Sequence, residues 1–580
     1  MGVKHGAGTL CASPLLWVRL RPRVMRGMKS ELYAVVCGLS AALAAVASPA
    51  PAATSPTSQE WRVCTGEAPA AADLVIKSCS AVIQSNRETK AKLALAHYHR
   101  ATAYRIEGHT DRAIQDYDRA IELDSKFAGA YNDRGTAYTQ KAQPNRAIQN
   151  FDQAIRLDPK LASAFNNRGN AYTIKGQPER AIQDYDQAIR LEPKYAFALN
   201  NRGNAYRNLG ELDRAIRDFD QAIRYEPRYV LAFNNRGSAY SSKGDLDRAI
   251  QDYDQAIRLA PLDAAAFNNR GLVFARKNEL SRAIQDYDQA IRLDPKLALA
   301  FNNRGNAHSS RGEPERAVQD YDQAIQLDPA YAFAFNNRGN AYRSLGNARR
   351  AIKDFDQAIR LAPSYALAFN NRGNTYTSLG ELDRAIQDYD QAIRLAPNLA
   401  MAYSNRGNAF SNKGELDRAI EDYDHAIRLN PRDVLAYDNR GLAHTRKGDL
   451  DRAIQDFDKA IALRPADPSA WNARCFARAL AGYLEMALAD CNEALRLRPE
   501  DTNTLDSRGF VYLKLGQADQ AIADYDAALR LNPQKAHALY GRGLAKRRKA
   551  DFSGAEADLM AANAISPRIG EQYRGYSIPP

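Results

Sequence analysis

Nine asparagines recur at one spacing along the chain and could bind a polypeptide backbone. An asparagine side chain carries two N–H donors and an acceptor oxygen, so it matches the polar groups of a peptide bond. A column of such side chains along a groove can hold an extended chain without reading that chain's side chains. We therefore predict a peptide-binding row made of Asn167, Asn201, Asn235, Asn269, Asn303, Asn337, Asn371, Asn405 and Asn439.

Further asparagines flank this row and predict a polar, mostly uncharged surface. One set stands one residue before the row, at Asn166, Asn200, Asn234, Asn268, Asn302, Asn336 and Asn370. A second set stands three residues after the row, on the same face of a helix, at Asn170, Asn204, Asn306, Asn340, Asn374 and Asn408.

Arginines and aspartates share the same period. One arginine recurs from Arg100 to Arg542, and aspartates such as Asp184 and Asp186 recur with it. Anion binding is one interpretation of the arginines. A ladder of structural ion pairs is the prediction we make, because the carboxylates keep the arginines' period and a planar guanidinium suits partly buried pairing. The Asp-Tyr-Asp strings mimic a DxD metal motif, but they fall in the middle of a helix in every period, so we expect no metal there.

Prolines set the organisation that must position these residues. Thirteen of them stand 34 residues apart, at Pro159, Pro193, Pro227, Pro261, Pro295, Pro329, Pro363, Pro397, Pro431, Pro465, Pro499, Pro533 and Pro567. With Ser125 in the same place one period earlier, they define fourteen 34-residue units over residues 94–569. Such a period indicates a stack of repeated helical hairpins.

The spacing of apolar residues within each unit predicts two helices. In the unit around Asn167, Phe165, Gly169 and Tyr172 lie at helical spacing, and Ala181, Tyr185 and Ala188 do so after a turn at 176–178. A proline ends the second helix, because it lacks the backbone N–H that the helix needs. Small residues recur where the two helices approach closely. A single hairpin cannot bury its apolar face alone, so each unit needs its neighbours.

The recurring aromatic, Gly, Tyr, Ala, aromatic, Ala and Pro residues resemble the tetratricopeptide-repeat (TPR) family. The resemblance implies an all-α fold, a TPR α-solenoid in which antiparallel helix pairs form a right-handed superhelix with the first helices on its concave side. The asparagine row is similar to the asparagine ladder in the repeat half of O-linked N-acetylglucosamine transferases. TPR modules that clamp carboxylate tails use lysines on this surface, and this chain has almost none there. The row ends at Ala473 and Ser507, so we expect the last three units to bind differently.

Residues 54–93 resemble a degenerate first hairpin that caps the stack. Its two cysteines, Cys64 and Cys79, are 15 residues apart, and Cys475 and Cys491 of the twelfth unit are 16 apart. Facing positions on paired helices can meet disulfide geometry, and an even cysteine count in an oxidising compartment favours bridges. We therefore predict Cys64–Cys79 and Cys475–Cys491; buried free thiols are the alternative.

The amino terminus predicts export. An apolar run from Leu32 to Ala47 follows Met28-Lys29 and is itself followed by small residues, which is typical of a signal peptide. We assign residues 1–53 as the leader, with translation starting at Met25 or Met28, and we expect a periplasmic or secreted protein of the bacterial envelope. An uncleaved membrane anchor is the alternative. After cleavage no stable membrane insertion is expected.

Composition and motifs favour a binding protein over an enzyme. The formal charge is +12, of which residues 1–53 hold six cations and one anion, and the remaining charges of both signs are interleaved, so no nucleic-acid partner is expected. The basic run 546–549 is a weak signal for an acidic partner. No phosphate loop, dinucleotide fingerprint, metalloprotease motif or nucleophile elbow is present, and only residues 570–580 follow the units as a tail. We predict no cofactor and no metal.

The predicted function is a non-catalytic scaffold that holds protein or peptide segments in a groove. A structural spacer that binds envelope components through its outer face and a glycan-binding scaffold are the alternatives.

Overall fold

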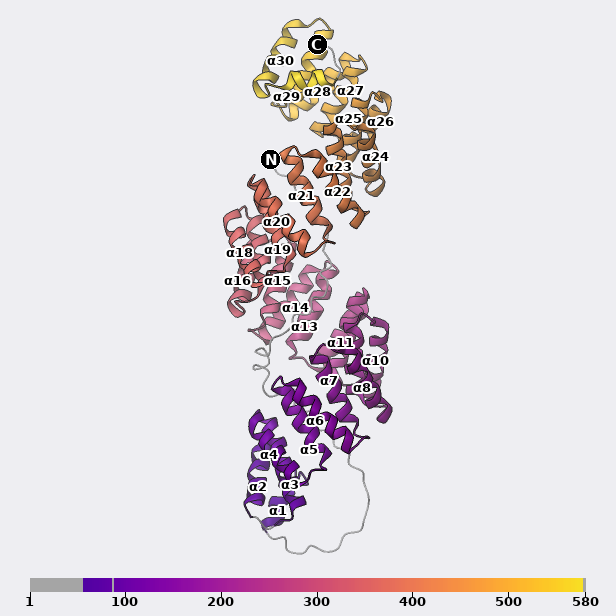
Figure 1. Ribbon diagram of the computed structural model, residues 1–580. Helices are drawn as coiled ribbons and strands as arrows, with labels where there is room; N and C mark the ends of the chain where they lie inside the picture. Colours follow the sequence, from indigo (N-terminus) through magenta and orange to yellow (C-terminus); the bar gives the residue numbers. More distant parts are fainter. Residues whose placement is uncertain (1–55, 86–87, 577–580) are drawn as a thin grey trace. The chain divides into compact units, whose positions relative to one another are not determined.

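The computed structural model describes residues 56–85 and 88–576, and all regular structure within these residues is α-helical (Figure 1). The 31 helices follow one another in consecutive antiparallel pairs, which confirms the predicted all-α solenoid of the TPR kind. They belong to two compact parts, residues 1–311 and residues 312–580, which we call the amino-terminal and carboxy-terminal parts. The predicted leader, residues 1–53, lies outside the described residues. None of the described helices is both long and apolar enough to cross a membrane.

Helices α1 (Pro56–Cys64) and α2 (Ala72–Ser85) form the predicted amino-terminal cap. The first helices of the fourteen repeats are α3 (Lys90–Ile106), α5 (Ala128–Gln140), α7 (Ala162–Ile174), α9 (Ala196–Asn208), α11 (Val230–Lys243), α13 (Ala264–Arg276), α15 (Ala298–Ser310), α17 (Ala332–Ser344), α19 (Ala366–Ser378), α21 (Ala400–Lys413), α23 (Val434–Lys447), α25 (Pro468–Ala481), α27 (Thr502–Lys514) and α29 (Ala536–Arg548).

The second helices are α4 (Thr110–Leu123), α6 (Pro144–Leu157), α8 (Pro178–Leu191), α10 (Leu212–Tyr225), α12 (Leu246–Leu259), α14 (Leu280–Leu293), α16 (Pro314–Leu327), α18 (Ala348–Leu361), α20 (Leu382–Leu395), α22 (Leu416–Leu429), α24 (Leu450–Leu463), α26 (Leu484–Leu497), α28 (Ala518–Leu531) and α30 (Phe552–Ile565). A last helix, α31 (Ile569–Gly575), occupies most of the predicted tail and packs against α29 and α30.

The two helices of a repeat approach closely at a glycine. Gly169 of α7 faces the ring of Tyr185 on α8, and both residues are buried, as are Ala181 and Ala188 on the same second helix. The ring therefore fills the space that a side chain at position 169 would need. This contact recurs along the stack and fixes how the first and second helices pair.

The turn between the two helices uses left-handed backbone. Gly176 has φ 72°, and the equivalent glycines of most other repeats are similar. Ala142, Asn278 and Ala550 occupy the same place with φ between 55° and 62°. Left-handed backbone costs little at glycine and more at a residue with a Cβ.

The first helices lie on the inner side of the local curve within each part. Successive first helices contact one another directly, whereas among the described residues of either part no two successive second helices do. The side chains on the first helices of adjacent repeats are consequently close enough to bond to one another. At the start of the stack, α3 begins at Lys90, four residues before the predicted boundary, where Thr89 accepts a hydrogen bond from the Lys92 backbone N–H.

Candidate peptide-binding face

All nine asparagines of the predicted row lie on first helices, from α7 to α23, and each is half-buried. We call these nine residues the ladder asparagines. Residues four before and three or seven after a ladder asparagine share its side of the helix. We call this side the ladder face. On α9, for example, it comprises Phe197, Asn201, Asn204 and Asn208.

The ladder asparagines bond to one another through the asparagines that precede them. Asn201 Nδ2 donates to Asn166 Oδ1 of the preceding repeat at 3.0 Å, and Asn166 Nδ2 donates to Asn167 Oδ1 at 3.2 Å. Asn167 Nδ2 then donates to Asn132 Oδ1 at 3.1 Å. The bond between repeats recurs as Asn235–Asn200 at 2.8 Å, Asn303–Asn268 at 3.0 Å, Asn371–Asn336 at 2.9 Å and Asn405–Asn370 at 2.9 Å.

This chain of bonds uses only half of the hydrogen-bonding capacity of a ladder amide such as that of Asn201. A side-chain amide has two N–H donors and an oxygen with two lone pairs. The side-chain amide of Asn201 donates one N–H to Asn166 of the preceding repeat, and its oxygen accepts one hydrogen bond from Asn200 Nδ2. The bonds fix the orientation of the amide and leave one donor and one acceptor for another molecule.

The preceding asparagines do not belong to the surface, and the prediction that they do is wrong. Asn166 is 5% exposed and Asn370 is 1% exposed; Asn200, Asn268, Asn302 and Asn336 are buried as well, while Asn234 is half-buried. They lie between successive first helices, where their amides bridge two repeats. We call this set the bridging asparagines.

The asparagines three residues after the row are also partly engaged. Asn170 Oδ1 accepts a hydrogen bond from the Tyr185 hydroxyl at 2.7 Å. Asn374 and Asn408 accept equivalent bonds from Tyr389 and Tyr423, at 2.8 and 2.7 Å. These asparagines thus hold the buried tyrosines of the second helices as well as lining the ladder face.

An apolar row runs beside the ladder asparagines, and the sequence analysis missed it. Its members stand four residues before a ladder asparagine. Phe197 is 37% exposed and Leu435 is 63% exposed. The row consists of Phe197, Leu231 and Leu299 in the amino-terminal part and Phe333, Leu367, Met401 and Leu435 in the carboxy-terminal part. A large apolar residue stands at this place in seven of the nine ladder repeats, and this recurrence is the signal that could have revealed the row.

The repeat arginines form the predicted ion-pair ladder. Arg202 Nε and Nη2 donate to Asp218 of the same repeat at 2.8 and 2.7 Å, and its Nη1 donates to Asp186 of the preceding repeat at 2.7 Å. Hydrogen bonds of this kind to Asp184 raise the pKa of Arg168. Each Asp-Tyr-Asp string therefore serves two arginines, its first aspartate in the same repeat and its second in the next. Over residues 56–85 and 88–576, no three His, Cys, Asp or Glu side chains are grouped to hold a metal ion.

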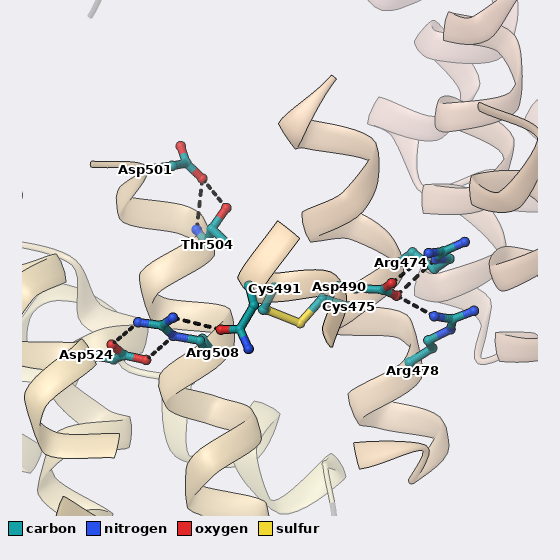
Figure 2. The surroundings of a disulfide bond; sticks show 10 residues. Arg474, Cys475, Arg478, Asp490, Cys491, Asp501, Thr504, Arg508 and Asp524 are labelled. Carbon is teal, nitrogen blue, oxygen red and sulfur yellow. Dashed lines mark hydrogen bonds and ion pairs between the residues drawn. A yellow bond between two sulfur atoms is a disulfide. The ribbon is translucent and has the colours of Figure 1, made fainter. Parts of the chain in front are cut away.

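The structure brings together both predicted cysteine pairs. The sulfur atoms of Cys64 and Cys79 are 2.16 Å apart, and those of Cys475 and Cys491 are 2.03 Å apart. Figure 2 shows the second pair between Asp490, which accepts hydrogen bonds from Arg474, and the next repeat's Arg508–Asp524 pair. Cys475 takes the place of the packing glycine and Cys491 that of the aromatic ring, so the disulfide replaces the usual contact between the two helices.

The last three repeats carry a different surface, and α31 with Tyr576 covers part of it. The ring of Tyr576 lies 5.8 Å from that of Phe476 and 5.5 Å from that of Phe510, and both phenylalanines stand three residues after the ladder place. The Tyr573 hydroxyl donates to the His537 carbonyl at 2.9 Å. The ladder face of these repeats thus packs against α31 and the residue that follows it.

Most of the basic side chains of residues 546–549 bond to other groups of the same chain. Lys546 pairs with Asp558 at 2.9 Å, Lys549 pairs with Asp519, and Arg548 donates to the Leu513 carbonyl at 2.5 Å. These contacts join the last repeats to one another.

Family models and solved structures resemble the chain over most of its length. A model described as TPR repeat matches residues 101–142, 135–173, 169–210, 305–346, 373–414 and 509–549. Two models described as tetratricopeptide repeat match residues 200–264, 237–298 and 404–468, and residues 332–365. Together these matches cover more than half of the chain. A comparison with curated protein sequences gave no match.

Among solved structures, the crystal structure of the APC/C hetero-tetramer Cut9–Hcn1 aligns with a TM-score of 0.52 at 18% identity, over 86% of this chain and 97% of the other. A tetratricopeptide repeat protein from Parabacteroides merdae aligns with a TM-score of 0.38 at 21% identity, over 43% and 98% of the two chains. YrrB, described as a TPR protein with an unusual peptide-binding site, aligns with a TM-score of 0.27 at 24% identity, over 32% and 95%. At these identities the likenesses concern the fold.

Proposed function

The chain belongs to the tetratricopeptide-repeat family, and we propose that it is a non-catalytic scaffold that holds an extended segment of another polypeptide along its ladder asparagines. TPR repeats form scaffolds suited to protein–protein interaction, and the family is generally non-catalytic. The bound segment, its orientation and its contacts below are our proposal.

The proposal rests on the hydrogen-bond donors and acceptors of the ladder amides that the chain itself leaves unused. Ladder amides such as that of Asn201 are half-buried and oriented by bonds to the bridging asparagines Asn166 and Asn200. The free N–H and lone pair that remain match the C=O and N–H of a peptide group. An extended backbone has no internal hydrogen bonds, so it can accept this pairing at repeat after repeat.

The apolar row gives the same segment a second contact. Exposed side chains such as Phe197 and Leu231 run parallel to the ladder asparagines. An extended chain presents side chains on both sides of its backbone, so a segment on the ladder can bury apolar side chains against this row. Burial of apolar side chains increases the affinity for the segment. The hydrogen bonds to the amides fix the register of the segment along the ladder.

We place the scaffold in the cell envelope or outside the cell, in the periplasm or secreted. Two cysteine pairs at bonding distance favour an oxidising compartment, and the sequence of residues 1–53 has the features of a signal peptide. Cell fractionation and amino-terminal sequencing of the product test this. A cytoplasmic product that retains Leu32 to Ala47 would contradict it.

Binding of a fluorescent random dodecapeptide library to the purified protein tests the ladder. The triple variant Asn201→Ala/Asn235→Ala/Asn269→Ala removes three neighbouring amides. At about 1 kcal/mol for each hydrogen bond, its affinity should fall by roughly 100-fold. The double variant Asn145→Ala/Asn398→Ala, which removes exposed amides outside the ladder, should bind as the wild type does.

Circular dichroism and thermal unfolding must show that the triple variant remains folded. If the folded triple variant binds the library with unchanged affinity in fluorescence polarisation, the ladder does not hold the peptide.

A further inference from the structure

Two arginines at the carboxy-terminal ends of first helices lack the carboxylate partners that the repeat arginines have. Arg207 lies at the end of α9 and Arg276 at the end of α13, on either side of α11 in the stack. Helices α9, α11 and α13 contain no aspartate or glutamate. Within the described residues, neither arginine has an ion pair, whereas Arg202 on the same helix as Arg207 contacts two aspartates.

Both guanidinium groups bond to serines of α11. Arg207 Nη1 donates to Ser238 Oγ at 2.7 Å, and its Nε is buried without a hydrogen-bond partner. Arg276 Nη1 donates to the Ser241 carbonyl at 2.5 Å and to Ser241 Oγ at 2.7 Å. The two cations are therefore held against hydroxyls one helical turn apart on α11.

The fifth repeat departs from the asparagine pattern at Ser238. Ser238 stands three residues after Asn235, where Asn170 and Asn204 stand in the two preceding repeats. The Ser238 hydroxyl binds the Arg207 guanidinium beside Tyr253 of α12. Burial raises the pKa of Tyr253, and the nearby charges of Arg207 and Arg276 act against that rise, which places both cations around one phenol.

The local electrostatics favour an anion. Burial lowers the pKa of Arg207, because the charged guanidinium is partly removed from water without a carboxylate to replace the lost hydration. A guanidinium stays protonated even so, and its planar set of N–H donors fits a carboxylate or phosphoryl group in a bidentate manner. Arg207 commits Nη1 to Ser238 and keeps Nη2 for such a group, whereas its Nε is buried.

We propose that Arg207 and Arg276, with the hydroxyls of Ser238 and Ser241, form a subsite for an anionic group, a carboxylate or a phosphoryl group, carried by the bound polypeptide. The proposal rests on the proposed function, because the subsite borders Asn201, Asn235 and Asn269 of the ladder. The subsite makes binding specific for an anionic side chain at one repeat, whereas the ladder asparagines bind only the peptide backbone. A segment held here has an acidic or phosphorylated residue in register with the fifth repeat.

The test uses four dodecapeptide libraries that are random except for one central residue, fixed as Glu, phosphoserine, Gln or Lys. At low ionic strength, the wild type should bind the Glu or the phosphoserine library about tenfold more tightly than the Gln library, which is the effect of one charge-assisted hydrogen bond. The order of the Glu and phosphoserine libraries identifies the group. The Lys library should bind most weakly.

The variant Arg207→Gln/Arg276→Gln should lose this preference and keep its affinity for the Gln library. The control Arg224→Gln/Arg258→Gln removes two exposed arginines from α10 and α12, has the same net charge, and should keep the preference. If the Gln library binds but the wild type shows no preference, or if the preference survives in Arg207→Gln/Arg276→Gln, the anion subsite is refuted while the ladder stands.

Phosphorus NMR of inorganic phosphate provides a readout that needs no peptide. The wild type should broaden the phosphate resonance more than Arg207→Gln/Arg276→Gln does, and the control should match the wild type. Equal broadening by all three proteins would refute the subsite. If no library binds but this difference is seen, the proposed peptide binding fails and the anion subsite remains.

Discussion

Gly169 lies against the ring of Tyr185 so closely that a Cβ on residue 169 would be 2.6 Å from Tyr185 Cε1. The same glycine–aromatic contact joins the helices of most repeats, for example Gly203 with Phe219 and Gly339 with Phe355. Because both partners are buried, the contact sets the distance between the first and second helices of these repeats.

Substitution Gly169→Ala should therefore destabilise the fold. The added methyl group cannot be accommodated unless the Tyr185 ring shifts in a packed interior, and such overpacking typically costs about 1–3 kcal/mol. Urea unfolding measures the loss. The double variant Gly169→Ala/Tyr185→Leu should recover part of it in a double-mutant cycle, and additive effects of the two substitutions would contradict the steric account.

The twelfth repeat offers a reverse test, because a disulfide stands where the glycine–aromatic contact belongs. The variant Cys475→Gly/Cys491→Tyr restores that contact and should fold without the bridge. Reducing agent should raise hydrogen exchange in α25 and α26 of the wild type, since a 16-residue cross-link is worth about 3 kcal/mol. It should leave exchange in the variant unchanged. Loss of the two helices in the variant under oxidising conditions would show that the bridge does more than replace the contact.

Asp438 makes the stability of the carboxy-terminal part depend on pH. It occupies the bridging-asparagine place before Asn439, and its Oδ1 is buried without a hydrogen-bond partner. Burial, with the nearby charge of Asp467, raises the pKa of Asp438 to about 7. An unfolded aspartate has a pKa of about 3.9, so the folded state binds the extra proton between these values and stability falls as pH rises from about 4 to 7.

The variant Asp438→Asn removes this loss and supplies an N–H donor. It should gain stability over the wild type at pH 8 relative to pH 4.5, by up to about 1.4 kcal/mol for each unit of the pKa shift. Urea unfolding at the two pH values measures the gain. Asp451→Asn, at an exposed place on α24, serves as the control. If Asp438→Asn changed the unfolding free energy equally at both pH values, folding would not raise the pKa of Asp438, which would contradict this prediction.

Ala142 adopts the left-handed turn that glycine adopts in most repeats, with φ 55°. The variant Ala142→Gly should raise the unfolding free energy by about 1 kcal/mol, because the left-handed cost of a Cβ exceeds the greater freedom of glycine in the unfolded chain. The reciprocal variant Gly176→Ala should lower it by a similar amount, since no atom lies within 4 Å of the added Cβ and only the backbone is strained. Opposite signs in thermal unfolding would contradict this.

The period of the sequence was enough to predict the helix pairs and the arginine–aspartate ladder. Arg202 and Asp218 share one repeat, so the constant phase of the sequence relates them directly. The bonds between asparagines were not predictable in this way. Asn201 and Asn166 are 35 residues apart, one more than the period, and this offset is set by how one helix pair is rotated on the next.

Two further features could not be predicted from the sequence for a similar reason. Phe197 and Leu231 have the apolar character of core residues, and only the stacking of the first helices shows that their side chains stay partly exposed. Helix α31 carries no repeat signal. Its Tyr573 packs against Phe510, and Tyr576, which follows the helix, packs against both Phe510 and Phe476.

The arginine contacts bear on how such a chain can change in length. Arg202 bonds to Asp218, 16 residues ahead, and to Asp186, 16 residues behind. These separations add up to 32 residues, and the spacing of two between the aspartates of each string completes the 34-residue period. Recombination within the gene that inserts or removes whole 34-residue segments would therefore keep arginines such as Arg202 between two carboxylates, whereas a change of any other length would leave one arginine without a carboxylate partner. The stack is built so that evolution can extend or trim it in complete modules without redesigning a single junction.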